Sequence, residues 1–126
     1  MKITLDFDST LSTPKIQKLA KHLIAQGHEV YVLTCRYCDL QAHRYPDNPT
    51  NSDLWATVKE LGIPDRNVIF LNDLRTSAKA KFLAKTNVNY HIDDNYSEVV
   101  RIRSSSNVIA IDAKTNYENI LKIIKP

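Results

Sequence analysis

Strand-like and helix-like segments alternate along the whole chain, and this alternation is the feature that most restricts its fold. Short runs rich in β-branched and other apolar residues are typical of strands that a sheet buries. Each run is followed by a segment with apolar residues at helical spacing, which is the order expected of parallel strands joined by crossover helices. The predicted strands are Lys2–Asp6, Glu29–Leu33, Val68–Leu71, Val88–Ile92 and Val108–Ile111.

The first predicted helix has a clear start and a clear end. Thr13 is a typical capping residue, Pro14 suits the first helical position, and Gly27 ends the apolar repeat. The other predicted helices are Ser52–Leu61, one capped by Thr76 or Ser77 that carries Ala78, Phe82 and Leu83, then Tyr96–Arg103 and Tyr117–Ile124. We therefore expect an α/β, three-layer, Rossmann-like fold with a central parallel five-stranded sheet, formed by residues 1–126 as one domain.

The composition is that of an ordinary globular domain. Hydrophobic residues make up 43% and charged residues 25% of the 126 positions, and the formal net charge is +3. That charge is compatible with an anionic substrate but too small to indicate nucleic-acid binding by itself. Because the sequence shows no membrane-spanning run and no N-terminal signal pattern, we expect a cytoplasmic protein without a membrane partner.

Polar side chains gather at the ends of three predicted strands. Asp6 and Asp8 end the first strand, Thr34 ends the second, and Asp93 and Asp94 end the fourth. The carboxyl ends of parallel strands share one edge of the sheet, where ligands bind in open α/β folds. Acids brought together there repel one another unless a cation lies among them, and carboxylate oxygens suit Mg²⁺. The sequence thus predicts a magnesium site for an anionic ligand.

These residues resemble the four motifs of the haloacid dehalogenase superfamily of phosphohydrolases, in the family's order. The stretch from Asp6 to Thr10 is similar to the first motif, DxDxT, and Thr34 matches the Thr or Ser of the second. Lys79 is the best match to the lysine of the third motif, although Lys81 and Lys85 compete for that assignment. The Asp93-Asp94 pair matches the acidic fourth motif. The resemblance covers nearly the whole chain and leaves no room for a cap domain, so it points to the small capless members.

The resemblance implies a role for each matching residue. Asp6 is the expected nucleophile, which forms an aspartyl phosphate, and Asp8 is the expected general acid and then general base. Thr34 and Lys79 are expected to hold the phosphoryl oxygens. Mg²⁺ is expected on the carboxylates of Asp6 and Asp94 and the backbone carbonyl of Asp8, with Asp93 assisting. The expected substrate contacts are Ser9, Thr10, Cys35 and Arg36.

The implied function is a Mg²⁺-dependent phosphomonoesterase. The form Ile92-Asp93-Asp94 is shared with 5′(3′)-deoxyribonucleotidases, and Thr34-Cys35-Arg36 is similar to the corresponding stretch in the phosphatase domain of bacteriophage polynucleotide kinases. Nucleotides or terminal phosphates of nucleic acids are therefore the expected substrate class. A phosphoprotein or small-metabolite phosphatase, or a non-catalytic phosphate-binding module, remains an alternative.

The polar segment Tyr37–Ser52 is a predicted loop that starts at the same edge and is long enough to suggest a function. Its basic and aromatic residues can grip phosphate or stack on a base, and a solvated loop without function is the alternative. The candidate recognition residues are Arg36, Tyr37, His43, Arg44 and Tyr45.

Other residues have plainer interpretations or support rival functions. Cys35 and Cys38 form a CxxC pair, for which two free thiols are favoured over a redox or zinc site. A response-regulator receiver also places acids, Thr and Lys at such an edge, but it carries its acidic pair on the first strand. His22 and His28 are interpreted as structural or exposed, His91 as a packed strand residue rather than a ligand, and Trp55 as a core residue.

Overall fold

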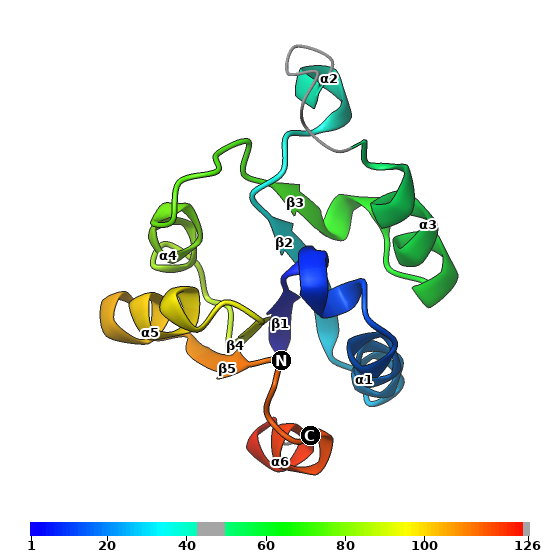
Figure 1. The fold of residues 1–126 in the computed structure, drawn as a ribbon. Helices are drawn as coiled ribbons and strands as arrows, with labels where there is room; N and C mark the ends of the chain where they lie inside the picture. The colour runs from blue at the N-terminus through cyan, green and yellow to red at the C-terminus, as the bar shows by residue number, and fades with distance from the viewer. Residues whose placement is uncertain (43–49, 125–126) are drawn as a thin grey trace.

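A computed structural model describes residues 1–42 and 50–124 and confirms the predicted parallel sheet (Figure 1). All four strand pairs are parallel, and the strand order is β3-β2-β1-β4-β5. Receiver domains have the order 2-1-3-4-5, so the receiver interpretation does not fit this sheet. The strands are β1 Lys2–Leu5, β2 Glu29–Thr34, β3 Val68–Phe70, β4 Tyr90–Asp93 and β5 Ile109–Asp112.

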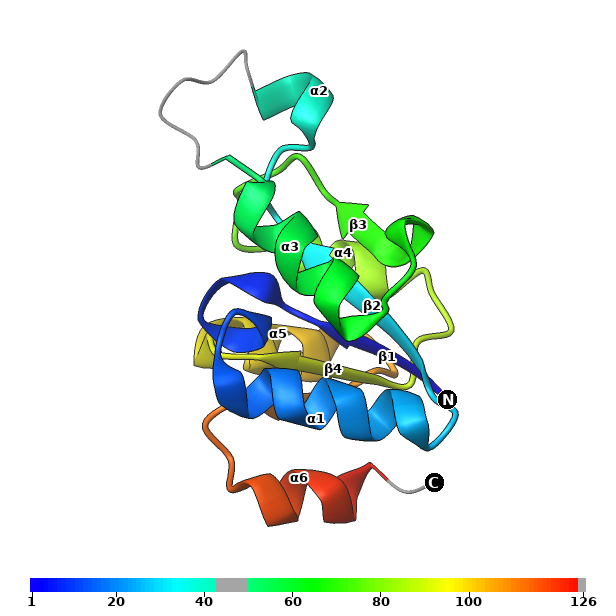
Figure 2. The same ribbon diagram turned by 90° about the vertical axis from the view of Figure 1, so that its right-hand side faces the viewer.

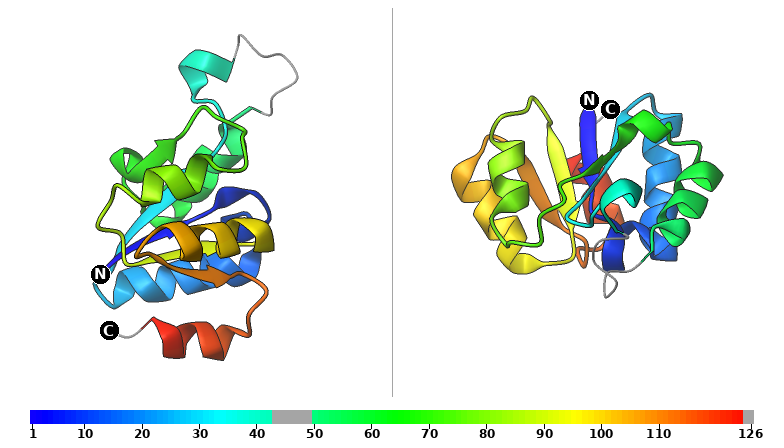
Figure 3. Two further views of the ribbon diagram at one scale, coloured as in Figure 1. Left: turned by 90° about the vertical axis from the view of Figure 1, so that its left-hand side faces the viewer. Right: turned by 90° about the horizontal axis from the view of Figure 1, so that it is seen from above.

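Helices cover both faces of the sheet and complete three layers. Helices α1, α3 and α6 lie on one face, where α6 runs beside α1 (Figure 2), and α4 and α5 lie together on the other face (Figure 3). The described residues form no cap domain. The helices are α1 Pro14–Ala25, α2 Asp39–Ala42, α3 Ser52–Leu61, α4 Ala78–Leu83, α5 Tyr96–Ser105 and α6 Tyr117–Ile123.

Two apolar clusters hold these layers together. One lies between β1, β2 and the helices α1, α3 and α6, and the other lies between β5 and the helices α4 and α5. Leu5 and Ile92 are fully buried at neighbouring positions of β1 and β4. This burial fixes the register of the two central strands, because a slip of one residue would turn their apolar side chains to the opposite face.

The strand order reverses between β1 and β4, and the register there positions the acids. Leu5 pairs with Ile92, so Asp6 and Asp93, each the next residue along its strand direction, emerge side by side at the carboxyl edge. The backbone N–H of Asp6 donates to the carbonyl of Ile92 at 3.0 Å, which continues the pairing past the end of β1. In open α/β sheets this reversal point is where ligands bind.

The chain leaves β1 through a π-helical turn, η1 (Phe7–Leu11), that the sequence did not predict. The N–H groups of Leu11 and Ser12 donate to the carbonyls of Asp6 and Phe7 at 3.0 and 2.9 Å. Ser9 sits inside this turn at φ 58°, a left-handed conformation that glycine adopts most easily. The turn carries Asp8 to the surface and returns Thr10 to the interior.

Most predicted helix and strand limits are within two residues of the observed ones. Helix α1 begins at Pro14, and α3 ends at Leu61 before Gly62, whose φ of 75° is left-handed. The predicted loop Tyr37–Ser52 contains the short helix α2 and is to that extent wrong. A short 3₁₀ turn, η2 (Asp65–Asn67), precedes β3. Within the described ranges, no helix combines the length and apolar character needed to cross a bilayer.

Candidate functional site

A buried ammonium group lies between two buried carboxylates at the carboxyl edge of the sheet. Lys79 extends from α4, and its Nζ donates to Asp6 Oδ1 at 2.6 Å and to Asp93 Oδ2 at 2.7 Å. The side chains of Lys79, Asp6 and Asp93 expose only 6%, 9% and 1% of their surface. Charges so far from water are tolerated because they pair with one another.

The pKa values in this cluster reflect both burial and pairing. Burial raises the pKa of Asp6 to about 7, against the opposing effect of the Lys79 charge. Burial alone would lower the pKa of Lys79, but the adjacent Asp6 and Asp93 carboxylates outweigh it and raise that pKa. Burial also opposes ionisation of Asp93, yet the hydrogen bond from His91 and the charge of Lys79 lower its pKa to about 2. Such perturbed groups in a cleft are typical of functional sites.

A second layer of hydrogen bonds holds Asp93 in place. His91 Nε2 lies 2.9 Å from Asp93 Oδ2, and His91 Nδ1 lies 2.7 Å from the hydroxyl of Thr4, its partner across the β1–β4 pair. The N–H of Asn95 donates to Asp93 Oδ1 at 3.1 Å. Burial lowers the pKa of His91, so the ring is neutral at physiological pH. His91 is thus a packed strand residue, as the sequence indicated, that also orients Asp93.

Thr10 connects the first acidic motif with the last. The single hydrogen of its buried hydroxyl is shared between Asp6 Oδ2 at 3.1 Å and Asp94 Oδ1 at 3.2 Å, and the hydroxyl oxygen accepts from the Asp94 N–H at 3.1 Å. The π-helical turn makes this contact possible, because it folds Thr10 back beneath Asp6. Thr10 therefore holds carboxylates together in this structure, and a direct contact with substrate stays a prediction.

Three carboxylates are close enough to hold one cation. Asp6, Asp93 and Asp94 each offer an oxygen, and these oxygens lie within 4.8 Å of one another. Oxygen donors of this kind fit Mg²⁺, and three acids beside one lysine leave negative charge for a cation to neutralise. The Asp8 carboxylate is not in this group, and a role for its backbone carbonyl stays a prediction.

The structure distinguishes the three lysines that compete for the third motif. Lys79 is buried in the cluster, whereas Lys81 and Lys85 are exposed to solvent. Lys79 is therefore the lysine that the fold brings to the predicted site.

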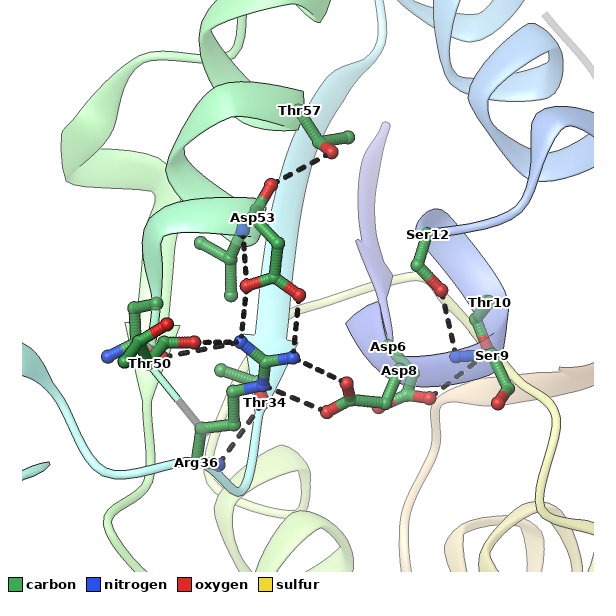
Figure 4. Close-up of polar contacts among 12 residues, drawn as sticks. Asp6, Asp8, Ser9, Thr10, Ser12, Thr34, Arg36, Thr50, Asp53 and Thr57 are labelled. Carbon is green, nitrogen blue, oxygen red and sulfur yellow. Dashed lines mark hydrogen bonds and ion pairs between the residues drawn. The ribbon is translucent and has the colours of Figure 1, made fainter. Parts of the chain in front are cut away.

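Asp8 lies at the surface beside this cluster, with 58% of its side chain exposed, and its carboxylate faces Arg36 (Figure 4). Thr34 is buried at the end of β2, and its hydroxyl accepts from the Arg36 N–H at 3.2 Å. Arg36 is itself buried and donates to Asp8 and to Asp53 of α3. A contact of Arg36 with substrate stays a prediction.

Two adjoining cavities open beside these residues. One has a volume of about 190 Å³ and the other about 280 Å³, and both are lined by Asp6, Asp8 and Lys79. Cys35 and Leu74 also line both cavities. The first cavity, and not the second, is lined by Thr34, Arg36 and Tyr37, and the second, and not the first, by Ser9. The predicted nucleophile, proton donor and phosphate-binding residues thus share one concave region.

The two cysteines of the CxxC pair, Cys35 and Cys38, are both free thiols. Burial raises the pKa of Cys35 to about 11, so its thiol stays protonated at neutral pH. Because the thiolate is the reactive form, this environment favours the interpretation of two free thiols.

The recognition residues predicted in the loop are only partly described. His43, Arg44 and Tyr45 lie outside the described residues. Close to the site, Asn51 Nδ2 donates to the Tyr37 carbonyl at 2.9 Å and to Asp39 Oδ1 at 2.8 Å. Trp55, predicted to be core, is only partly buried there, and its indole N–H donates to Asp39 Oδ2 at 2.8 Å.

Two acids near the site were missed in the sequence. Asp53 pairs with Arg36, and no pattern in the sequence links these two residues. Glu98 lines the second cavity from the first turn of α5, and its buried Oε2 has no hydrogen-bond partner among the described residues. Burial raises the pKa of Glu98. Its position, one helical turn after Asp94, is the signal that would have identified it.

Comparisons with known proteins add no relative to this picture. No family model matches the sequence, and no curated protein matches it either.

Proposed function

We propose that the protein is a Mg²⁺-dependent phosphomonoester hydrolase that acts through an aspartyl phosphate on Asp6. One observation carries the proposal: a buried lysine and three carboxylates meet at the strand-order reversal, beside a cavity that also exposes Asp8. A carboxylate is a poor nucleophile toward a phosphate anion unless positive charge offsets the repulsion. Lys79 supplies such a charge next to Asp6.

In the first step, an Asp6 carboxylate oxygen attacks phosphorus while the bond from phosphorus to the leaving oxygen breaks. The electron pair of that bond goes to the leaving oxygen, which takes a proton from Asp8. In the second step, water attacks the phosphorus and gives a proton to Asp8, and the bond from phosphorus to Asp6 breaks. The exposed Asp8 side chain is accessible to both the leaving group and water, while Asp6 is shielded.

The carboxylates suited to Mg²⁺ are those of Asp6 and Asp94, with Asp93 assisting. When bound, the ion would neutralise phosphate charge and orient the transferring group. Lys79 and Thr10 hold the Asp6 carboxylate through different oxygens, Oδ1 and Oδ2, and so restrict its rotation. This restriction favours attack from one defined direction.

Nucleotides or nucleic-acid terminal phosphates are the substrate class that we propose. The described residues contain no cap over the site, so a large leaving group can extend from the edge of the sheet. Tyr37 and Leu74 give the first cavity an aromatic and an apolar wall next to Lys79. Aromatic side chains of this kind can stack on a base.

The proposal is tested by phosphate release from 5′- and 3′-mononucleotides, 5′- and 3′-phosphorylated oligonucleotides and an aryl phosphate. Each substrate is assayed with Mg²⁺ and with EDTA. We expect release that requires Mg²⁺ and that Asp6→Asn abolishes while circular dichroism shows an intact fold. Asn keeps the size of the side chain and an acceptor for Lys79.

The matched control is Asp65→Asn, because Asp65 is an exposed carboxylate in η2, before β3, and lines neither cavity of the site. We expect Asp65→Asn to retain wild-type rates. Full activity in Asp6→Asn would rule out the covalent mechanism. If wild-type protein releases phosphate from none of these substrates, a phosphate-binding module without turnover becomes the better description.

A further inference from the structure

Arg36 is held between two carboxylates by both edges of its guanidinium group (Figure 4). Its Nε and Nη2 donate to Asp8 Oδ2 and Oδ1 at 3.1 and 2.7 Å. Its Nη1 and Nη2 donate to Asp53 Oδ1 and Oδ2 at 2.9 and 3.1 Å. Each contact is a paired, fork-like interaction, which fixes orientation as well as distance.

These contacts use the full donor capacity of Arg36. The remaining Nη1 hydrogen reaches the Thr50 carbonyl at 3.1 Å, with Asn51 Oδ1 3.5 Å away. An arginine has five N–H donors, and all five have acceptors here. In this arrangement no donor is left for a substrate phosphate, which is the role that the sequence suggested.

The surroundings make Arg36 a rigid support. Its side chain is only 8% exposed, and the guanidinium lies over the Phe7 ring with 5.0 Å to the ring centre. The Arg36 backbone is fixed at both polar groups, because its N–H donates to Thr34 and its carbonyl accepts from Asn72.

Asp8, in contrast, has little else to hold it. Its side chain is 58% exposed, and the hydrogen bonds that its carboxylate makes to the described residues all come from Arg36. An exposed carboxylate without such a partner samples several rotamers. The direction in which Asp8 points is therefore set by Arg36.

Asp53 has its own part in this arrangement. It shares the positive charge of Arg36 with Asp8, so Asp8 does not face an uncompensated cation. The hydrogen bonds from Arg36 lower the pKa of Asp53, which keeps it ionised at neutral pH. Asp53 lies in the first turn of α3 and thereby ties the position of Arg36 to that helix.

We propose that Arg36 is a positioning residue that orients Asp8 for its proton transfer in the hydrolysis of the aspartyl phosphate, and that Asp53 holds Arg36 in place. This inference rests on the proposed function. The step itself is the attack of water on phosphorus: the water proton passes to the Asp8 carboxylate, the bond from phosphorus to Asp6 breaks, and phosphate leaves. In the structure both carboxylate oxygens of Asp8 accept hydrogen bonds from Arg36, and these two contacts set the direction in which the carboxylate faces.

The test compares the steady-state and single-turnover kinetics of Arg36→Met, Arg36→Lys and Asp53→Asn on an aryl phosphate. An aryl leaving group needs little protonation, so formation of the aspartyl phosphate proceeds without a well-placed Asp8. Hydrolysis of the aspartyl phosphate still needs Asp8 to take the proton from water. Aspartyl phosphate is trapped by acid quench and quantified as label bound to protein. The control is Arg66→Met, which removes the same charge from an exposed residue in η2, just before β3.

For Arg36→Met we expect kcat to fall about 100-fold, the size of a lost proton-transfer or alignment contribution, and KM to fall with it, so that kcat/KM, which reports the first step, changes less than about threefold. Phosphoenzyme should accumulate toward one per site, because its hydrolysis becomes limiting. Arg36→Lys should behave like Arg36→Met, because lysine keeps the charge but not the fork. Asp53→Asn should show a smaller fall of the same kind, and Arg66→Met should match wild type.

A rise in KM of about tenfold with kcat retained, restored by Arg36→Lys, would overturn the proposal and assign Arg36 to phosphate binding. Wild-type kinetics in Arg36→Met, or a fall in kcat without phosphoenzyme, would overturn it as well. Because phosphoenzyme forms only in a folded site, its accumulation separates a slow second step from misfolding. A wild-type protein that neither releases phosphate nor forms phosphoenzyme is a different result, which refutes the proposed function itself.

Discussion

Replacing Lys79 with methionine tests whether the site is held together by charge pairing. Methionine keeps most of the length and apolar stem of lysine but removes the ammonium group that contacts Asp6 and Asp93 at 2.6 and 2.7 Å. The two carboxylates, 9% and 1% exposed, would then lie side by side without a counterion. Removing one partner of a buried ion pair typically costs about 3–5 kcal/mol.

That loss is large against the total stability of a domain, which is about 5–15 kcal/mol. With a urea dependence of about 2 kcal/mol per molar, we expect the unfolding midpoint of Lys79→Met to fall by about 2 M. The stability that Lys79→Met loses relative to wild type should be larger at about pH 8 than at about pH 5, because protonated Asp6 and Asp93 side chains need no counterion. In a protein that already carries Asp6→Asn, Lys79→Met should cost about 0.5–3 kcal/mol less stability than it costs in the wild-type protein.

The assay is urea unfolding followed by circular dichroism, in EDTA so that no divalent ion replaces the ammonium group. Lys81→Met is the matched control, because Lys81 lies on the same helix but is exposed, and its change should stay within about 0.5 kcal/mol. If Lys79→Met loses no more stability than Lys81→Met, the buried charge pairing described for the site is wrong.

Three further predictions concern one histidine and two helix ends, and they use the same urea assay. Burial and the nearby N-terminal amino group lower the pKa of His28 from 6.5, so folding disfavours its protonated form. The free energy of unfolding should therefore fall as the pH drops below about 6.5, and it should fall less in His28→Gln. The control His22→Gln, at an exposed histidine, should show the same fall as wild type. Gly62→Ala should cost about 1–2 kcal/mol, because φ is 75° and the added Cβ meets no atom that offsets the strain; a neutral result would contradict the left-handed helix end. Asn95→Ala should cost about 1 kcal/mol by removing the acceptor at the start of α5, and Asn95→Asp should restore it.

The fold was largely readable from local patterns. Thr13-Pro14 and Gly62 mark the start of α1 and the end of α3, since proline and glycine act through their own backbone geometry. The alternation of apolar runs gave the parallel sheet, and the ends of β1 and β4 gave the edge where acids meet. Each of these signals is carried by neighbouring residues.

The parts that were not readable depend on contacts between distant segments. The π-helical turn Phe7–Leu11 is tied to Asp94 through Thr10, and α2 is tied to α3 through Asp39 and Trp55. No local pattern reports either contact.

The same limit applies to the site. Lysines on helices are usually solvated, so the sequence favoured Lys79 only through the motif resemblance and left Lys81 and Lys85 as competitors; the packing of α4 against the sheet buries Lys79 and leaves the other two exposed. The pairing of Arg36 with Asp53 joins residues 17 positions apart across a loop of irregular sequence. A basic residue at the carboxyl edge of the sheet was therefore interpreted as a phosphate contact, whereas its guanidinium donates to the carboxylates of Asp8 and Asp53 and to the Thr50 carbonyl.

The central claim is that Asp6 carries the phosphoryl group during turnover, and the most direct measurement is to find that group on the protein. Wild-type protein is mixed with an aryl phosphate and Mg²⁺, quenched in acid, digested and analysed by mass spectrometry. We expect one phosphoryl group on the peptide that contains Asp6, labile to hydroxylamine and absent from Asp6→Asn. Phosphate release with the phosphoryl group on a peptide that lacks Asp6 would contradict the claim.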